Sequence, residues 1–410
     1  MAKFLRISSN YLKKNSLNLS RVASQRQGFA TTSCRPQDVI EKNLFTPGPL
    51  NTHADTRAAM QQDFGSRDKE FIDCIKYIRT SLISFAGLSP DKFTCIPMQG
   101  AGTMGVESVI GTTVPRDGKM LICTNGAYGD RIGQIAKVLG INAVVHKDIE
   151  TEATNVKKVE EVLKNDQSIT NVAMVHCETT TGVFNPIEEV GQVVRQHAPN
   201  AAFFVDAMSS FAAVPIDFEK AGIDFLVSSA NKCTEGVPGF SFILANIEKL
   251  LKCEGNARSL SLDALGQYKG FLDNGQFRFT PPTHVLMAFR KAIEIQKEEG
   301  GVEGRSKRYQ ENRKILKAGM NEMGFKELLK DSDQGYIITS FYYPDHPNFD
   351  FEAFYKRLSE KGQVIYPGKV SQAACFRIGN IGQLYPDDMI VLLKCIKEVC
   401  NEMNIPLPLA

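Results

Sequence analysis

Residues 202–232 read AFFVDAMSSFAAVPIDFEKAGIDFLVSSANK, and this segment indicates the fold class. It contains two short apolar runs, Ala202–Ala207 and Phe225–Ser229, which are continuous rather than alternating. Continuous runs of this length are typical of strands that are buried on both faces of a parallel sheet. Asp206 lies near the end of the first run, and Lys232 follows the second. Ligands of open α/β sheets bind at the carboxyl ends of the strands, so both side chains are predicted to lie at that edge.

Similar runs occur on both sides of this segment. Five more are predicted to be strands: Phe93–Met98, Met120–Thr124, Ala143–His146, Val172–Cys177 and Phe240–Ala245. Helical segments lie between several of them, for example Val156–Lys164 and Glu188–His197. This alternation predicts an α/β fold, with a mainly parallel sheet of about seven strands in a large domain.

The chain changes character after the dipeptide Pro281-Pro282. Residues 285–323 are predicted to form long charged helices that are interrupted at Gly300-Gly301. A strand, a helix, a second strand and a last helix are expected to follow at Tyr336–Tyr343, Phe351–Lys361, Cys375–Ile378 and Asp387–Met403. This pattern predicts a smaller α+β domain. We therefore divide the chain into a large domain with an N-terminal arm, residues 36–284, and a small C-terminal domain, residues 285–410.

Composition excludes several classes of protein. The chain has 410 residues, of which 43% are hydrophobic, and this is enough for a large core and for two domains. The 48 Lys and Arg residues nearly balance 46 Asp and Glu, so there is no reason to expect a nucleic-acid partner. The sequence contains no apolar run long enough for a transmembrane helix. The ten cysteines form no CxxC pair and do not cluster with histidines, which argues against a metal site or a disulfide framework and fits a reducing compartment.

The first 35 residues differ from the rest of the chain. Residues 1–37 contain no Asp or Glu but seven Lys or Arg, together with many Ser and Asn. An Arg-rich, Ser-rich and acid-poor composition is typical of a mitochondrial transit peptide. The sequence therefore predicts that residues 1–35 are removed and that the mature protein lies in the mitochondrial matrix. A disordered basic tail is the alternative.

The glycine-rich segment after Phe93–Met98 is a candidate phosphate-binding turn. Gly100, Gly102 and Gly105 match the spacing G-x-G-x-x-G between a predicted strand and a predicted helix. Glycines let backbone N–H groups approach an anion, which the helix N-terminus attracts. A dinucleotide site would need an acidic residue near the end of the next strand, but that strand ends in Thr124–Gly126. A dinucleotide is therefore disfavoured, and a tight turn without a ligand stays an alternative.

Asp206, Lys232 and the glycine turn together fit pyridoxal 5′-phosphate. The aldehyde of this cofactor forms a Schiff base with a lysine amine, its pyridine nitrogen stays protonated beside a carboxylate, and its phosphate needs N–H donors. A lysine at an apolar strand end is unfavourable to bury unless it is neutralised, which this bond achieves. Each residue alone has an ordinary explanation, since Asp206 could cap a helix and Lys232 could lie on the surface. Together they predict the cofactor site.

Eight segments resemble, in the expected order, the motifs of the fold-type I, class-V pyridoxal-phosphate aminotransferase family. These segments are Leu44–Leu50, Gly100–Thr103, Thr124–Arg131, Cys177–Gly182, Val205–Ser210, Ser229–Cys233, Phe277–Thr283 and Phe376–Gly382. Within the family the chain is most similar to enzymes that act on 2-aminoethylphosphonate and pyruvate. The resemblance implies a ping-pong transamination that gives phosphonoacetaldehyde and L-alanine.

The resemblance also implies a role for each matching residue. Lys232 would hold the cofactor and shuttle the substrate proton, and Asp206 would pair with the pyridine nitrogen, so these two are the expected catalytic residues. The other expected cofactor contacts are the phosphate donors Gly102, Thr103 and Asn231, the stacking ring of Tyr128, and Thr179, which would bond the phenolic oxygen. Relatives often carry Trp at the position of Tyr128, and this chain has none, but a Tyr ring can also stack.

Two further expectations concern the partner subunit and the substrates. Thr280 lies in a segment that in the family reaches the phosphate bound by the partner, which implies a homodimer with shared sites. Phe277, in the same segment, lacks the hydroxyl that some relatives have. Arg377 is expected to bind the phosphonate and then the pyruvate carboxylate, because a guanidinium fork suits both anions, with a structural salt bridge as the alternative. Thr46–Gly48 or Arg67 could add phosphonate contacts.

Other functions stay open. Alanine–glyoxylate and serine–pyruvate transaminases share the same plan. A nicotinamide-dependent oxidoreductase and a non-enzymatic phosphate-binding module are alternatives from other classes. His176 is expected to be a hydrogen-bonded core residue, and Cys233 a packing residue rather than a nucleophile.

Overall fold

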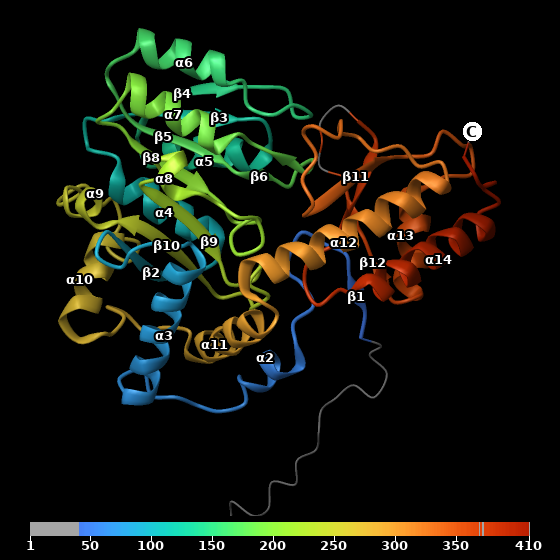
Figure 1. Cartoon of the computed structure of the whole chain (residues 1–410), viewed down its shortest axis with the longest axis horizontal. Coiled ribbons are helices and arrows are strands. Elements are labelled where there is room, and N and C mark those ends of the chain that lie inside the picture. Colours follow the sequence, from blue (N-terminus) through green and yellow to red (C-terminus); the bar gives the residue numbers. More distant parts are fainter. Residues whose placement is uncertain (1–40, 369, 371–372, 410) are drawn as a thin grey trace, which may run out of the picture. The chain divides into compact units, whose positions relative to one another are not determined.

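The computed structural model describes residues 41–368, 370 and 373–409 (Figure 1). From Lys42 onward the chain forms one compact unit. The predicted transit peptide, residues 1–35, lies outside the described residues. None of the described helices is both long enough and apolar enough to span a lipid bilayer.

A seven-stranded sheet forms the centre of this unit. Its strands lie in the order β2 (Phe93–Gln99), β10 (Phe240–Asn246), β9 (Phe225–Ser229), β8 (Ala202–Asp206), β5 (Ile169–Val175), β3 (Lys119–Thr124) and β4 (Asn142–Lys147). All neighbouring strands are parallel except β10, which is antiparallel to both β2 and β9. The α/β class and the mainly parallel sheet of seven strands, both predicted from the apolar runs, are confirmed.

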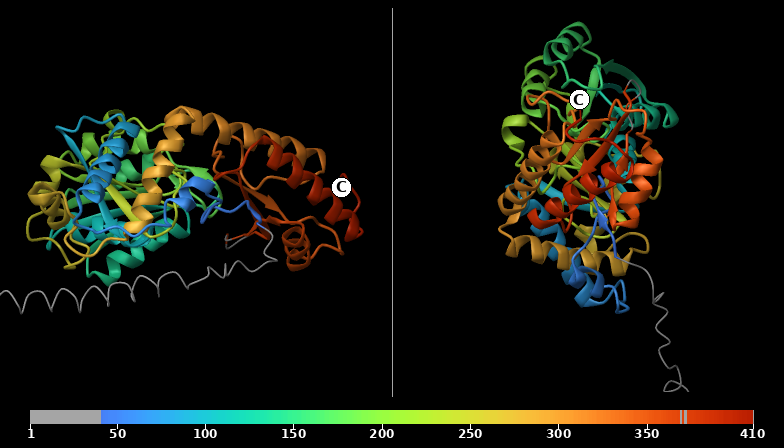
Figure 2. Two further views of the ribbon diagram at one scale, coloured as in Figure 1. Left: turned by 90° about the horizontal axis from the view of Figure 1, so that it is seen from below. Right: turned by 90° about the vertical axis from the view of Figure 1, so that its right-hand side faces the viewer.

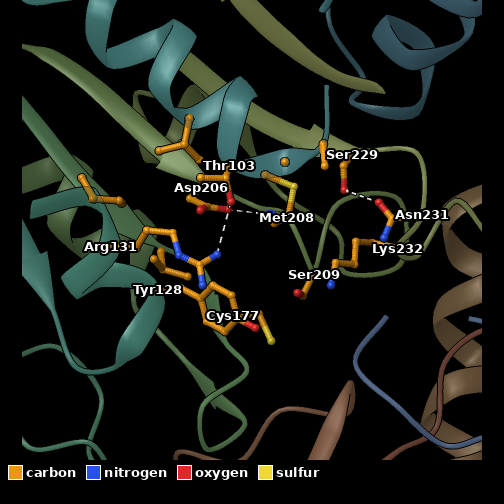
Figure 3. A pocket seen from close by; sticks show the side chains of 15 residues that line it. Thr103, Tyr128, Arg131, Cys177, Asp206, Met208, Ser209, Ser229, Asn231 and Lys232 are labelled. Carbon is orange, nitrogen blue, oxygen red and sulfur yellow. Dashed lines mark hydrogen bonds between the residues drawn. The ribbon is translucent and has the colours of Figure 1, made fainter. Parts of the chain in front are cut away.

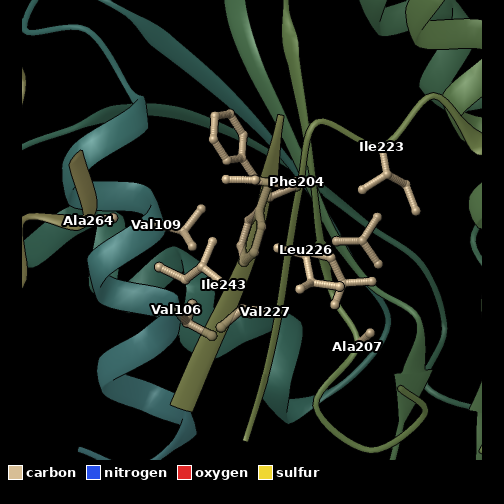
Figure 4. Close-up of a cluster of buried hydrophobic side chains, with 14 of the residues drawn as sticks. Val106, Val109, Phe204, Ala207, Ile223, Leu226, Val227, Ile243 and Ala264 are labelled. Atoms are coloured by element: carbon tan, nitrogen blue, oxygen red, sulfur yellow. The ribbon is translucent and has the colours of Figure 1, made fainter. Parts of the chain in front are cut away.

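Burial explains why most of these strands are continuous apolar runs. Every residue of β9 is buried, so its two faces both need apolar side chains. Figure 4 shows one face, where Val227 of β9 lies beside Val106 of the helix α4 (Gly102–Thr113). The edge strand β4 differs, because only β3 pairs with it and its residues are exposed or half-buried.

The helices of this part of the chain connect the strands or pack beside them. They are α2 (Ala54–Ala58), α3 (Lys69–Phe85), α4, α5 (Ala127–Val138), α6 (Val156–Asn165), α7 (Ile187–His197), α8 (Phe218–Ala221), α9 (Ile247–Leu251), α10 (Ala264–Asn274) and α11 (Thr283–Glu298). Helix α4 packs against β8, β9 and β10, and α5 packs against β3, β4 and β5. Since α4 and α5 follow β2 and β3 almost directly, their N-termini lie at the carboxyl ends of the parallel strands.

A second, smaller sheet lies in the C-terminal part. Its strands are antiparallel, in the order β11 (Ile338–Tyr342), β14 (Cys375–Gly379) and β13 (Tyr366–Pro367). The helices there are α12 (Gly301–Glu322), α13 (Phe351–Glu360) and α14 (Pro386–Glu402), of which α12 and α14 pack together (Figure 2). The helical break predicted at Gly300-Gly301 is present, with positive φ angles of 102° and 71°. The predicted division into residues 36–284 and 285–410 stays a prediction.

Two short pairings complete the fold. Strand β1 (Asn43–Leu44) is parallel to β12 (Gln363–Val364), and β6 (Cys177–Glu178) is antiparallel to β7 (Val183–Phe184). The strand predicted at Val172–Cys177 is therefore too long, because β5 stops at Val175 and Cys177 belongs to a separate hairpin. The turn of this hairpin contains Gly182, whose φ of +116° favours glycine.

Candidate active site

A cavity of about 200 Å³ lies at the carboxyl ends of β5, β8 and β9, beside the N-termini of α4 and α5 (Figure 3). It is lined by six of the predicted cofactor residues: Gly102, Thr103, Tyr128, Asp206, Asn231 and Lys232. They come from separate segments, which the fold brings together because the carboxyl ends of parallel strands meet at one edge. The predicted lysine, carboxylate and helix N-terminus therefore share one cavity.

Lys232 stands in the turn after β9, where its side chain is half-buried and lines the cavity. Desolvation lowers the pKa of Lys232 to about 8, because burial disfavours the charged amine. Its Nζ donates a hydrogen bond to the carbonyl oxygen of Pro47 at 2.7 Å. A Cβ on Gly48 would lie 2.8 Å from the same Nζ, so only glycine lets the chain approach this closely. A substantial neutral fraction of the amine is thus present near physiological pH.

Asp206 ends β8 and is 5% exposed. Burial raises the pKa of Asp206 to about 6, and the hydrogen bond from the backbone N–H of Met208 to Oδ1, 2.9 Å long, opposes this rise. Above that pH the carboxylate is ionised. Its Oδ2 accepts no hydrogen bond from the described part of the chain, so its charge is available to a cation in the cavity.

The first turn of α4 offers donors for an anion. Ala101 precedes this helix and supplies no capping side chain, and the N–H of Met104 already donates to the carbonyl oxygen of Ala101, so the N–H groups of Gly102 and Thr103 are the ones available to a ligand. A Cβ on Gly102 would lie 2.5 Å from Sδ of Met208, so a larger residue there would require the methionine side chain to move. Asn231 accepts a hydrogen bond at Oδ1 from Ser229 Oγ at 3.1 Å, which leaves its amide N–H groups to donate.

Arg131 also lines this cavity, and the sequence reasoning gave it no role. Its Nη1 donates to Thr103 Oγ1 at 3.3 Å, and its guanidinium lies 4.9 Å from the centroid of the Tyr128 ring (Figure 3). No described carboxylate forms an ion pair with it. Tyr128 and Arg131 lie three residues apart on α5, so they share a helix face, but no helix was predicted over this segment to indicate it.

Thr179 and Arg377 do not line the cavity but contact each other. Arg377, on β14, is 2% exposed, and its Nη1 donates to the carbonyl oxygen of Thr179 at 2.6 Å. Its Nε donates to the carbonyl oxygen of Pro367 at 2.9 Å. Burial lowers the pKa of Arg377. Because the normal pKa of an arginine is very high, the guanidinium nevertheless stays charged. No described carboxylate pairs with it, so within the described chain it is not part of a salt bridge.

Three other predicted contacts lie elsewhere. Thr280 is exposed in the loop between α10 and α11, where its carbonyl oxygen accepts a hydrogen bond from Gln99 Nε2 at 3.3 Å. Arg67 is exposed before α3. Thr46 is buried and donates from Oγ1 to the carbonyl oxygen of Pro49 at 2.6 Å, so its hydroxyl stabilises the turn next to Lys232.

The remaining candidates behave as core residues. Cys233 donates from Sγ to the carbonyl oxygen of Ser209 at 3.1 Å, and burial raises the pKa of its thiol to about 12. His176 is buried as expected, but its Nδ1 has no hydrogen-bond partner within the described residues. Burial lowers the pKa of His176 to about 4, so the ring is neutral, and it packs 5.6 Å from the ring of Phe184. The described residues contain no group of three His, Cys, Asp or Glu side chains that could hold a metal ion.

Comparison with known proteins gives close relatives. Residues 29–373 match the family described as aminotransferase class-V. The chain is 49% identical over 357 residues to a protein of Vibrio vulnificus named 2-aminoethylphosphonate–pyruvate transaminase, covering 87% of this chain and 96% of the relative. Proteins with the same name from Bacillus cytotoxicus and Bacteroides fragilis are 48% and 47% identical, each over 87% of this chain and over 97% and 98% of the relative.

These relatives overturn the predicted location. They come from bacteria, which have no mitochondria, so the prediction of a mitochondrial matrix enzyme is wrong. The prediction rested on the composition of residues 1–35 alone. A basic, acid-poor composition is shared by many terminal segments and does not specify an organelle.

Solved structures share the fold. The ureidoglycine–glyoxylate aminotransferase of Bacillus subtilis superimposes with a TM-score of 0.82 at 22% identity, covering 91% of this chain and 96% of that one. The pyridoxamine–pyruvate aminotransferase of Mesorhizobium loti gives a TM-score of 0.82 at 23% identity, covering 91% and 95%. The family match over residues 29–373 and the relatives at 47–49% identity show that this chain belongs to the class-V aminotransferase family.

Proposed function

We propose that this chain is a pyridoxal 5′-phosphate-dependent aminotransferase that transfers the amino group of 2-aminoethylphosphonate to pyruvate. The products would be phosphonoacetaldehyde and L-alanine. The observation that carries the proposal is the single cavity that joins Lys232, Asp206 and the N-terminus of α4. The amino donor is supported by the names of the relatives at 47–49% identity and by the buried, unneutralised charge of Arg377.

The chemistry of the cavity fits this cofactor. Pyridoxal phosphate, when bound, supplies an aldehyde that takes up an amino group and a protonated ring that withdraws electrons from the substrate. Lys232 Nζ would hold the aldehyde, and Asp206 would hold the ring nitrogen. The uncapped N-terminus of α4, with Gly102, Thr103 and Asn231, would hold the phosphate. Tyr128 would stack on the ring, and Thr179 would bond the phenolic oxygen.

Lys232 is suited to move the substrate proton. Since desolvation lowers the pKa of Lys232 to about 8, Nζ can accept a proton near neutral pH and release it again in the same half-reaction. The amine donates to the carbonyl oxygen of Pro47, 2.7 Å from Nζ, which orients it within the cavity. A surface lysine with an ordinary pKa would stay protonated and could not act as the base.

Asp206 is suited to keep a proton on the ring nitrogen. It does so only as a carboxylate, and burial raises its pKa to about 6, so the ionised form dominates above that value. A positive ring nitrogen beside the carboxylate would lower the pKa of Asp206 further, because opposite charges favour the ionised form.

Arg377 would bind the anionic end of each substrate in turn. Its Nε and Nη1 are fixed by backbone carbonyls of Pro367 and Thr179, which aligns the guanidinium plane. Both substrates would then use one site, as a ping-pong mechanism requires, with the phosphonate and the carboxylate on the same fork.

We further propose that the enzyme is a homodimer with shared sites. Thr280 lies outside the cavity of its own chain and is exposed, which fits a hydroxyl that contributes to the site of the partner subunit. The oligomeric state in solution, and loss of cofactor affinity on replacing Thr280 by valine, test this part of the proposal separately.

Product analysis tests the proposed reaction. The purified chain with pyridoxal phosphate, 2-aminoethylphosphonate and pyruvate should form L-alanine and phosphonoacetaldehyde in equal amounts. Alanine with glyoxylate, and serine with pyruvate, are the competing substrate pairs. A higher kcat/KM for either competing pair would keep the aminotransferase and reject the amino donor.

A further inference from the structure

Glu178 is a buried carboxylate next to the cavity that the proposed mechanism does not use. It lies between Cys177, which lines the cavity, and Thr179, and its side chain is fully buried. Its Oε2 accepts hydrogen bonds from the backbone N–H groups of Tyr128 at 3.1 Å and Gly129 at 3.2 Å. Its Oε1 accepts hydrogen bonds from the backbone N–H and from the hydroxyl of Thr180. Both oxygens of this carboxylate are therefore fully engaged.

These contacts cap helix α5 from a distant segment. Gly126 precedes the helix and has no side chain to cap it. The N–H of Ala127 donates to Thr180 Oγ1 at 2.9 Å, and the next two N–H groups donate to Glu178. The negative charge at this N-terminus is favourable because of the helix dipole. A Cβ on Gly126 would lie 2.5 Å from Cδ of Glu178, so the glycine makes room for the carboxylate.

The opposite side of the same segment contacts the substrate-binding arginine. The carbonyl oxygen of Thr179 accepts the hydrogen bond from Arg377 Nη1, and the carbonyl oxygen of Thr181 accepts one from Ser340 Oγ at 2.7 Å. Residues 178–181 are thus fixed to α5 on one side and to β11 and β14 on the other. The Glu178 carboxylate belongs to this segment, which connects α5 with β11 and β14.

We propose that Glu178 is a positioning residue that holds Tyr128, Thr179 and Arg377 in a fixed mutual arrangement. The proposal rests on the proposed function, because it assigns these three residues to the cofactor ring, its phenolic oxygen and the substrate anion. Glu178 touches neither cofactor nor substrate and acts through the backbone of Tyr128 and Thr179. Without the Glu178 carboxylate, Tyr128 and Arg377 would both still be present, but the distance and orientation between them would no longer be fixed.

Burial and charge are consistent with this role. Burial raises the pKa of Glu178, whereas the hydrogen bonds from Thr180, Gly129 and Tyr128 oppose the rise. A buried carboxylate without such partners would be strongly unfavourable, so the four hydrogen bonds account for its presence.

Glu178→Gln is the sharpest test because it preserves the shape. An amide has one accepting oxygen, so its NH2 group must face either the N–H groups of α5 or the N–H of Thr180. Asp224→Asn is the matched control, since Asp224 is a carboxylate whose Oδ2 accepts the backbone N–H of Phe203 at 3.0 Å, in the segment that leads into β9, away from the cavity. Burial raises the pKa of Asp224 as well.

Five quantities are measured on the full chain: the melting temperature without cofactor, the Kd of pyridoxal phosphate, the ellipticity of the bound-cofactor band, and the KM and kcat for 2-aminoethylphosphonate. Glu178→Gln is expected to raise the Kd and the KM about tenfold, as one misdirected buried hydrogen bond implies, and to weaken the ellipticity of the band. Asp224→Asn is expected to lower the melting temperature only.

A second variant decides the matter should Glu178→Gln fail to fold. Thr180→Val keeps the carboxylate and removes the hydroxyl that donates to it, and a smaller change in the same direction is expected. Wild-type Kd, KM and ellipticity in a folded variant would overturn the proposal and leave Glu178 as a helix cap only. Failure of the proposed function is distinguishable, because the wild-type chain would then show either no cofactor band or a band that does not respond to 2-aminoethylphosphonate.

Discussion

Replacement of Arg377 by alanine is predicted to weaken both half-reactions of the proposed cycle. The guanidinium donates to the carbonyl oxygens of Thr179 and Pro367, and its remaining N–H groups would bind the phosphonate and then the pyruvate carboxylate. A hydrogen bond to a charged group contributes about 1.5–3 kcal/mol, and about 1.4 kcal/mol corresponds to a factor of ten. Loss of even one such bond should lower kcat/KM roughly 10- to 100-fold for both substrates.

The same change also affects stability, so it needs a matched control. Removing the guanidinium leaves two carbonyl oxygens without their partner, at about 1–3 kcal/mol for each that stays buried. Arg258 is a suitable control because it also donates to backbone carbonyls, those of Val114 at 2.7 Å and Pro115 at 3.1 Å, and it does not line the cavity. Burial lowers the pKa of Arg258 as it does for Arg377.

Steady-state kinetics and thermal unfolding of the two variants separate the effects. Both Arg377→Ala and Arg258→Ala should lower Tm, but only the former should lower kcat/KM. Unchanged kcat/KM for both substrates in a folded Arg377→Ala protein would refute the assignment. A loss for one substrate only would refute the idea that one guanidinium serves both half-reactions.

Three further predictions concern the lysine and its surroundings. Asp206→Asn should lower kcat by about 10²- to 10³-fold at nearly unchanged Tm, because an amide cannot stabilise a positive ring nitrogen; single-turnover kinetics measure this. The rate at which the cofactor-free chain captures pyridoxal phosphate should rise with pH through about 8, since only the neutral amine of Lys232 attacks the aldehyde; a flat stopped-flow profile would contradict it. Gly48→Ala should raise the Kd of the cofactor, because its Cβ would lie 2.8 Å from Lys232 Nζ, whereas Gly87→Ala, also at positive φ but with nothing within 4 Å, should lower Tm alone.

The strands and the strand-end residues could be predicted from local sequence. Strand β9 is buried on both faces, so its apolar run is continuous and its end at Ser229 is sharp. Lys232 follows that end directly, and Asp206 ends the neighbouring β8, so the geometry of a parallel sheet was enough to place them together. The helix start at Gly102 was visible for the same reason, since glycines mark the turn after β2.

Contacts between distant segments could not be predicted in this way. Pro47 reaches Lys232 although 185 residues separate them, a contact that no local pattern indicates. In the sequence, Glu178 is a single charged residue followed by threonines. Its structural role depends on contacts with a helix that begins about 50 residues earlier. The separate hairpin at Cys177 was hidden because only one residue, His176, separates Cys177 from the apolar run of β5, and no Gly or Pro marks the break.

The half-reaction of the purified chain tests the central claim most directly. The cofactor-loaded protein is mixed with 2-aminoethylphosphonate alone, without a keto acid, and the visible absorbance band of the bound cofactor is followed. Rapid loss of the band, and its return on addition of pyruvate, is the predicted result. A band that stays unchanged with 2-aminoethylphosphonate but is lost with alanine or serine would contradict the proposed amino donor. Absence of any band from the wild-type chain would contradict the assignment of Lys232 and the cofactor itself.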